Sequence, residues 1–337
     1  MGKRRFGPRR LAVLAAKAVL GGLAVVVLIL VGLRIAAAAR ESGAEPPSGV
    51  SRVKTPLGAV AVQVSGPADG PPVLLVHGTA AWSGFWRGPA THLATRGWRV
   101  IAVDLPPFGW SEHDPEARYS RTDQAERLSA VLAALAGRPA VVVAHSFGSG
   151  AATELALRHP RQVRSLVLVD AALGELDPKQ GSGALAASLG FAPLAEGAVA
   201  ATVTNPAAMR PLLQSMLARK EAADAWVPVL QAPMRREGTT AAYAAWLPNL
   251  FVRDDGALSR RSAGLAAIRV PVAVIWGGAD TVTPPGQGRR IARLTRARSF
   301  AVLPGVGHVP HIEDPDRFLA ALDAAVAPDR EGRHDAK

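Results

Sequence analysis

Six short apolar runs, separated by segments of helical periodicity, constrain the fold of this chain more than any other feature. Each run is built from Val, Leu, Ile, Ala or Phe, without a polar residue: Val73–Val76, Val100–Val103, Ala140–Val143, Leu166–Val169, Val272–Ile275 and Phe300–Leu303. Strands that are buried on both faces have this pattern, because helices cover both sides of a parallel sheet. We therefore predict an α/β fold, with a mostly parallel sheet flanked by helices.

The alternation stops between residues 173 and 263. This interval contains no strong strand pattern but many Ala, Leu, Met and Trp residues. A structureless loop of that length is improbable in a compact domain. We predict a helical insertion at 173–263 between two parts of a core, 58–172 and 264–327, followed by a polar tail at 328–337.

The N-terminal segment, residues 1–40, has the composition of a membrane-targeting sequence. Eight of the 39 basic residues and none of the 27 acidic residues lie there, which accounts for most of the net charge of +12. The stretch Leu11–Leu33 is apolar except for Lys17, so it is either a retained transmembrane anchor or a cleaved signal. In both cases the basic flank would stay in the cytoplasm and the domain would lie outside it. An anchor would tether the domain through a Pro- and Gly-containing linker at 41–57, whereas cleavage of a signal would release the domain as a secreted protein.

Charge elsewhere in the chain is nearly balanced. Residues 41–337 retain 31 basic residues against 27 acidic ones, which gives no support for nucleic-acid binding. The chain has no cysteine, so disulfides, thiolate metal sites and a cysteine nucleophile are excluded.

A candidate nucleophile follows the third apolar run. The sequence continues as Ala144-His-Ser146-Phe147-Gly148-Ser-Gly150 and then as the helical pattern 151–158. This is the strand–turn–helix motif G-x-S-x-G, with Ala144 in place of the first glycine. Such a turn exposes the serine hydroxyl, and the backbone N–H of the next residue faces the oxyanion that forms during attack. Ser146 is the predicted nucleophile.

Further motifs follow two other strands and precede the C-terminal helix. They are His77-Gly78-Thr79, Asp104-x-x-x-x-Gly109-x-Ser111 and Gly305-Val-Gly-His308. Together with the serine motif they occur in the order typical of the α/β-hydrolase superfamily, which the chain resembles from about Gly58 to Val326. The resemblance implies an α/β-hydrolase fold, oxyanion-hole N–H groups at Thr79 and Phe147, and a helical cap formed by the insertion.

His308 is the predicted general base and Asp280, after the fifth run, the predicted acid, in the chain order Ser–Asp–His. Two alternatives stay open, namely His311 as the base and Asp170, at another strand end, as the acid. Some members of the superfamily place their acid at that earlier position. His113, His159 and His311 are expected at surface or loop positions, and His77 is expected to shape its turn.

These residues predict a serine hydrolase that acts on carboxylic esters without a metal or other cofactor. Apolar residues of the insertion favour apolar acyl groups, and Trp82, Trp86 and Trp246 are the candidate pocket walls. A small-molecule ester is the expected partner besides the membrane, and the layout resembles single-span monoacylglycerol lipases. The alternatives are a C–C bond hydrolase, a cofactor-free haloperoxidase-like enzyme, or a non-catalytic binding protein on the same fold.

Overall fold

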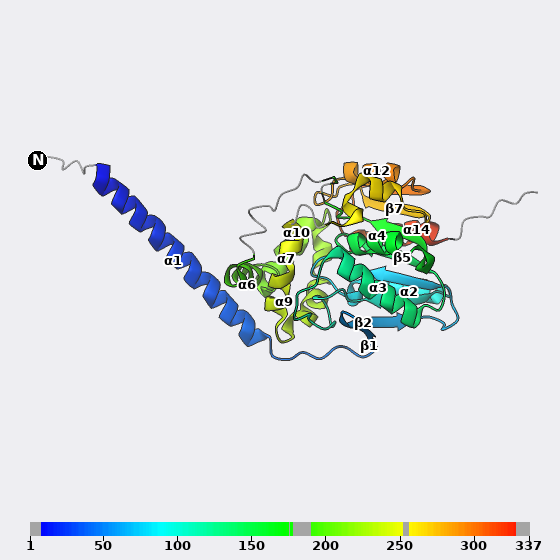
Figure 1. The fold of residues 1–337 in the computed structure, drawn as a ribbon, viewed down its shortest axis with the longest axis horizontal. Helices are drawn as coiled ribbons and strands as arrows, with labels where there is room; N and C mark the ends of the chain where they lie inside the picture. The colour runs from blue at the N-terminus through cyan, green and yellow to red at the C-terminus, as the bar shows by residue number, and fades with distance from the viewer. Residues whose placement is uncertain (1–7, 175, 178–189, 252–255, 328–337) are drawn as a thin grey trace, which may run out of the picture.

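A computed structural model describes residues 8–174, 176–177, 190–251 and 256–327, so the predicted polar tail at 328–337 lies outside the described residues. Within these ranges the chain forms an eight-stranded sheet of order β1-β2-β4-β3-β5-β6-β7-β8 (Figure 1). The pairs β1–β2 and β2–β4 are antiparallel, and all other neighbours are parallel. The strands are β1 (Val50–Thr55), β2 (Gly58–Ser65), β3 (Pro72–Val76), β4 (Arg99–Val103), β5 (Ala140–His145), β6 (Val163–Val169), β7 (Val272–Gly277) and β8 (Ser299–Leu303).

All six predicted strands are confirmed, as β3 to β8, and the five central ones separate two hydrophobic cores. Successive side chains of a strand point to opposite faces. On β3, Leu74 and Val76 belong to the core that includes residues of α3, α4 and α12, whereas Val73 and Leu75 belong to the core that includes residues of α2 and α14. The helices around the sheet are α2 (Arg87–Thr95), α3 (Arg121–Leu135), α4 (Gly148–Arg158), α11 (Ser262–Ala266), α12 (Pro285–Leu294), α13 (Pro310–Glu313) and α14 (Pro315–Val326).

The structure corrects the expected linker at 41–57. Its second half forms the edge strand β1, which pairs with β2 from Val50 opposite Gln63 to Thr55 opposite Gly58. Most side chains of β1 are polar and exposed, as is usual for an edge strand, so hydrophobicity did not reveal it. The sheet therefore begins before the position at which folding was expected to start.

Every regular element that the structure describes in the insertion is helical. Its elements between β6 and α11 cover the edge at which the parallel strands end, and Figure 1 shows them between the sheet and α1. They are α6 (Ala192–Ala201), α7 (Pro206–Met216), α8 (Val227–Gln231), α9 (Thr239–Trp246), α10 (Pro248–Phe251) and short 3₁₀ turns. Side chains from these helices share a hydrophobic cluster with residues of the loops that follow β3, β4 and β5.

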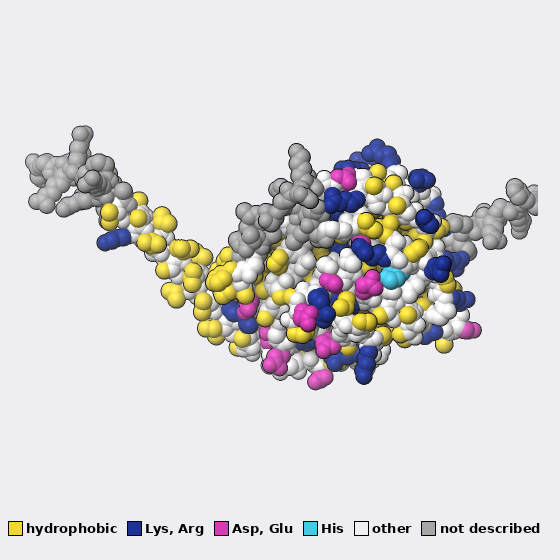
Figure 2. Space-filling model, viewed as in Figure 1, with side chains coloured by type: hydrophobic (Ala, Val, Ile, Leu, Met, Phe, Trp, Pro, Cys, Tyr) yellow, Lys and Arg dark blue, Asp and Glu magenta, His cyan; other side chains and the backbone are white. Residues whose placement is uncertain are grey.

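The first helix, α1 (Pro8–Arg40), extends away from the body of the molecule (Figure 1). Its segment Ala15–Arg40 is long and apolar enough to cross a membrane, with a mean hydropathy of 2.6 over its most apolar window. None of that window is buried against the rest of the protein. Figure 2 shows its hydrophobic side chains exposed along the projecting part.

Candidate active site

Ser146 occupies a sharp turn between β5 and α4. Its φ of 50° lies in the left-handed region, which is sterically costly for a residue with a side chain. The Ser146 N–H donates to the carbonyl oxygen of Val169 at 3.0 Å, and its own carbonyl accepts from the N–H of Ala172 at the same distance. A Cβ atom at Gly148 would lie 2.2 Å from the carbonyl oxygen of His77, so the turn requires glycine there. The surrounding backbone thus holds the serine in its strained conformation.

Three buried side chains from separate loops form a hydrogen-bonded chain. The Nε2 atom of His308 lies 2.8 Å from the Oγ of Ser146, and its Nδ1 lies 2.8 Å from the Oδ2 of Asp280. Ser146 follows β5, Asp280 follows β7 and His308 follows β8. Because parallel strands end at one edge of the sheet, residues far apart in sequence meet there.

The carboxylate of Asp280 is oriented by its own loop. Its Oδ1 accepts the backbone N–H groups of Val282 and Thr283 at 2.8 and 2.9 Å, and its Oδ2 accepts the hydroxyl of Thr283 at 2.6 Å. Burial acts to raise the pKa of Asp280, but the hydrogen bond and charge of His308 and the bonds from Thr283 outweigh it and hold the pKa below its ordinary value. An ionised Asp280 fixes the Nδ1–H tautomer of His308, which leaves Nε2 free to accept a proton.

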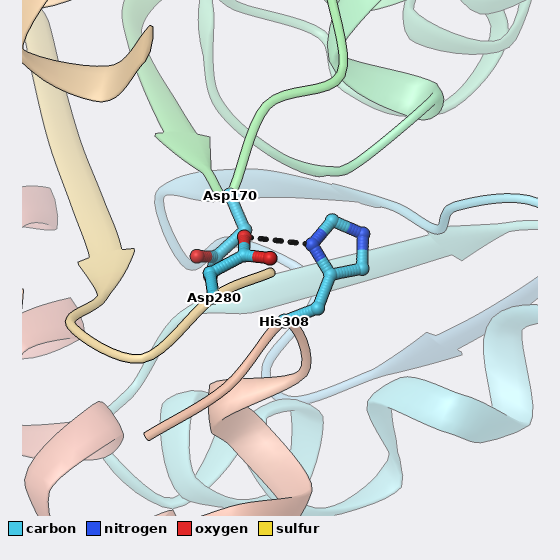
Figure 3. Close-up of side chains that lie close together, drawn as sticks. All are labelled: Asp170, Asp280 and His308. Atoms are coloured by element: carbon cyan, nitrogen blue, oxygen red, sulfur yellow. Dashed lines mark hydrogen bonds and ion pairs between the residues drawn. The ribbon is translucent and has the colours of Figure 1, made fainter. Parts of the chain in front are cut away.

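Asp170, the alternative acid, lies beside this pair but takes no part in the chain. Figure 3 shows the two carboxyl groups next to each other, with the dashed line joining His308 to Asp280. The Oδ1 of Asp170 accepts the N–H of Gly277 at 2.7 Å. Burial, and to a smaller extent the charge of Asp280, raises the pKa of Asp170 well above its ordinary value, so its protonated form is favoured.

Asp170, Asp280 and His308 form the only group among the described residues with metal-ligand geometry, since their donor atoms lie within 4.8 Å of one another. The Nδ1 of His308 is already bonded to Asp280, and a protonated Asp170 is a poor ligand. The group is better described as an acid–base cluster than as a metal site.

The two residues predicted to form an oxyanion hole, Phe147 and Thr79, lie on the loops that follow β5 and β3. Phe147 is the residue before α4, so its N–H belongs to the unsatisfied donors of a helix N-terminus. Among the described residues, no acceptor is found for the N–H of Phe147 or for that of Thr79. Gly78 brings the two loops together, because a Cβ there would lie 2.9 Å from the Cβ of Ser146.

The loop of Thr79 is shaped by His77 and Asp104. His77 donates from Nδ1 to the carbonyl of Gly78 at 2.7 Å and accepts the N–H of Leu105 at Nε2, at 2.8 Å. Burial lowers the pKa of His77 to about 4, which keeps the ring neutral for this pair of bonds. Asp104 accepts the N–H of Ser83 at 2.6 Å and is in turn buried. The His-Gly and Asp motifs therefore form the structural frame of the loop, as expected for His77.

The loop of His308 is held by two residues that the sequence analysis did not select. His145 donates from Nε2 to the carbonyl oxygen of His308 at 2.8 Å, and burial lowers the pKa of His145 to about 3. Glu313 is buried, and its carboxylate accepts the N–H of Gly307 at 3.0 Å on the loop. The same carboxylate accepts the N–H groups of Ala218 and Arg219, at 2.8 and 3.0 Å, from the insertion. The signal available in the sequence for Glu313 was an acidic residue close to His308 in a segment rich in glycine and proline.

His311, the alternative base, was expected at a surface or loop position, and the structure corrects this expectation. It is buried, and its ring stacks on Trp86 with 4.5 Å between the ring centroids. Neither of its ring nitrogens has a partner among the described atoms, and burial lowers the pKa of His311 well below its ordinary value. Tertiary packing accounts for the difference, because all four residues of α13 are buried and the His311 ring lies 5.7 Å from the ring of Phe318 on α14.

The three tryptophans proposed as pocket walls lie in different environments. Trp86 is fully buried in the core under α2 and α14, and Trp82 donates from Nε1 to the carbonyl of Val229 in a small separate cluster. Trp246, on α9, packs its ring at 5.0 Å from the ring of Phe147, the residue after the serine. It belongs to the apolar cluster between the insertion and the strand-end loops.

Comparison with known proteins adds a family model, two curated relatives and a solved structure. Residues 71–315 match the family model described as alpha/beta hydrolase fold. The chain is 32% identical to a 2-hydroxymuconate semialdehyde hydrolase of Pseudomonas sp. (strain CF600), over 75% of this chain and 88% of that protein. It is 30% identical to a pimeloyl-[acyl-carrier protein] methyl ester esterase of Neisseria meningitidis, over 74% of each.

The solved structure of a membrane phospholipase A superposes with a TM-score of 0.60 and 25% identity, covering 93% of this chain and 97% of that one. That coverage exceeds what residues 50–327 alone comprise, so the likeness extends beyond the sheet and its insertion.

Proposed function

The chain belongs to the alpha/beta hydrolase fold family, and from that premise we propose that it is a serine hydrolase that cleaves carboxylic esters through an acyl-enzyme intermediate. The observation that carries this proposal is the hydrogen-bonded chain of Ser146, His308 and Asp280, with both links at 2.8 Å. A nucleophile, a base and a group that orients the base are the parts that acyl transfer needs.

In the acylation step His308 removes the hydroxyl proton of Ser146 through Nε2 while Oγ attacks the ester carbonyl. The negative charge moves to the carbonyl oxygen, where the N–H groups of Phe147 and Thr79 stabilise it. The imidazolium of His308, stabilised by Asp280, then gives its proton to the departing alcohol, and the acyl group stays on Ser146.

Deacylation repeats these roles with water. His308 takes a proton from the water molecule, the hydroxide attacks the acyl carbon, and the same two N–H groups stabilise the second oxyanion. Collapse of this intermediate returns the proton to Ser146 and releases the carboxylic acid. No metal or organic cofactor enters the sequence.

The proposed substrates are esters with apolar acyl groups, and the insertion is the proposed cap over the serine. Support comes from the cluster between the two, whose members include Phe85, Phe108, Tyr243 and Trp246. We retain Trp246 as the pocket wall because it contacts Phe147, whereas Trp82 and Trp86 already pack against other parts of the core.

A C–C bond hydrolase of the same fold is the second candidate, because a 2-hydroxymuconate semialdehyde hydrolase is 32% identical to this chain. Muconate derivatives carry a carboxylate, which calls for a cation in the pocket. Trp246 of the cap packs on Phe147 beside the nucleophile, and this apolar contact suits an apolar acyl group, which supports the ester as the first candidate.

We also propose that α1 anchors the protein in the membrane, with the catalytic domain outside the cytoplasm. The length and hydropathy of Ala15–Arg40, the basic residues that precede Leu11, and the extended likeness to a membrane phospholipase A support this arrangement.

The test of the enzymatic proposal uses the full-length protein in detergent and p-nitrophenyl esters of increasing acyl length. A fluorophosphonate probe should label Ser146, and Ser146→Ala should remove both labelling and hydrolysis. Ser149→Ala is the matched control, since Ser149 donates its hydroxyl to the carbonyl of Ala144 and has no contact with His308. Folded Ser146→Ala protein that still hydrolyses the esters would refute the proposal, and wild-type protein that binds but never turns over would indicate a binding protein.

A further inference from the structure

The carboxyl-terminal part of α1 is packed against the cap rather than merely tethered to it. Leu30, Leu33, Arg34 and Ala37 are partly or fully buried, whereas residues 15–29 are exposed. Positions three and four apart lie on one face of a helix. One face of α1 is therefore covered from Leu30 onward.

The element that covers this face is α6, the first helix of the cap that the structure describes. A Cβ atom at Gly197 would lie 2.8 Å from the Cβ of Leu30, so the two helices approach closely because this position has no side chain. One turn further along α1, the Nε of Arg34 lies 2.5 Å from the Oε2 of Glu196. Glu196 is the only charged residue of α6, and Arg34 of α1 pairs with it.

These contacts fix the height of α6 relative to the apolar stretch of α1. That stretch, Leu11–Leu33, measures about 34 Å along the helix axis, close to the roughly 30 Å thickness of a bilayer's hydrocarbon core. Leu30 lies about 5 Å inside its end. If α1 spans a membrane, the part of α6 around Gly197 lies at the boundary between the headgroups and the acyl chains.

The first turn of α6 is apolar and unusually exposed. Phe191, just before the helix, is 65% exposed and Leu194 is 40% exposed, and Ala192 and Pro193 between them are also exposed. Figure 2 shows hydrophobic side chains continuing from α1 onto the body at the place where Figure 1 puts α6. An apolar patch that continues a membrane-spanning surface matches lipid rather than water.

We propose that α1 and α6 enter the membrane together, with Phe191 and Leu194 inserted among the acyl chains of the leaflet next to the catalytic domain. The proposal rests on the anchor proposed above, and it commits α1 to being retained, since its removal would expose the face of α6 that Leu30 covers. The surface binds lipid through apolar contact, with the Arg34–Glu196 pair at the polar boundary.

This placement connects the bilayer to the site through one further helix. α6 packs on α9, and Trp246 of α9 contacts Phe147 beside the nucleophile. Ala195 and Val199 of α6 belong to the same apolar cluster as Phe147. Buried apolar packing thus connects the helix proposed to enter the membrane with the residue beside the nucleophile.

The absence of cysteine from the chain permits a direct test. Single cysteines are introduced in the full-length protein by Phe191→Cys, Leu194→Cys, Leu23→Cys or Val302→Cys, labelled with a small bimane fluorophore, and reconstituted in phosphatidylcholine–phosphatidylglycerol vesicles. Part of the lipid bears a nitroxide quencher on its acyl chain. Val302, 40% exposed on β8, is the matched control, and Leu23, 59% exposed in α1, reports the anchor.

We expect quenching at Phe191 and Leu194 to be at least about threefold stronger than at Val302, as for side chains inserted at the acyl boundary. If Leu23 is quenched but Phe191 and Leu194 are quenched no more than Val302, the insertion of α6 is overturned and the anchor stands. Absence of quenching at Leu23 would overturn both. Hydrolysis of a soluble p-nitrophenyl ester by the same samples reports the proposed enzymatic function separately.

Discussion

An Asp280→Asn substitution exchanges one oxygen for an NH₂ group, and the hydrogen bonds around it determine where that group goes. The N–H groups of Val282 and Thr283 both point at Oδ1, so the carbonyl oxygen of the asparagine must occupy that position. The NH₂ group then replaces Oδ2 and faces the Nδ1 of His308. A donor at this place forces Nδ1 to accept, and the imidazole proton moves to Nε2.

With its proton on Nε2, His308 cannot accept the hydroxyl proton of Ser146. General-base catalysis contributes about 10²–10⁴-fold to the rate. We therefore expect kcat to fall about 10³-fold, which corresponds to about 4 kcal/mol in the activation free energy. The KM for a p-nitrophenyl ester should change little, because Asp280 is buried behind His308.

Asp170→Asn is the matched control, since Asp170 lies next to the same pair. Its favoured form is already the neutral one, and an asparagine keeps both the acceptor for the N–H of Gly277 and a neutral donor group. We expect kcat to stay within about threefold of the wild type, as for a substitution that preserves shape and hydrogen bonding. Steady-state kinetics of both variants, with circular dichroism as the check of folding, provide the measurement. A larger loss in Asp170→Asn than in Asp280→Asn would mean that Asp170 is the acid and that the argument is wrong.

Three other outcomes are expected. The folded-state pKa of His145 is about 3 and the unfolded value is 6.5, so below pH 6.5 only the unfolded state binds its proton and stability is lost as pH falls. Between pH 6.5 and 4.5 the decrease in the free energy of unfolding should be about 2 kcal/mol smaller in His145→Asn than in the wild type, by denaturant titration; equal decreases in the two proteins would contradict the low pKa of His145. Gly197→Leu should destabilise the detergent-solubilised protein by about 2 kcal/mol through overpacking on Leu30, whereas Gly22→Leu, with nothing within 4 Å, should not. The full-length protein should stay with membranes after carbonate washing, and protease added to bacterial spheroplasts should digest the domain; a protected domain would place it on the cytoplasmic side.

The strands that build the site were predictable because their sequences have one interpretation. Runs such as 73–76 and 140–143 are too short and too apolar to be anything but buried strands between helices. The edge strand at 50–55 could not be found this way, because exposure to solvent removes the hydrophobic pattern. Pairing with β2 defines it, and pairing is not visible in a single sequence.

Within the site, sequence order alone left two carboxyl groups as candidates. Asp170 and Asp280 both follow strands, and only the direction of their side chains separates them, with the Nδ1 of His308 bonded to Asp280. Burial explains the other differences between the sequence-based expectations and the structure. His311 and Trp86 stand in loop-like sequence yet stack on each other in the core, because tertiary packing rather than local composition decides which short segments are buried.

The carboxylate of Glu313 has a consequence for how members of this fold exchange parts. This carboxylate accepts hydrogen bonds from the backbone of the histidine loop and from residues 218 and 219 of the cap, so both segments depend on the same buried charge. A chimaera that receives a foreign cap would lose two of these bonds and leave a buried charge partly unsatisfied. We expect that grafts succeed only when the segments 216–219 and 307–313 are transplanted together. The two segments should therefore change together among related proteins, although they lie far apart in the sequence.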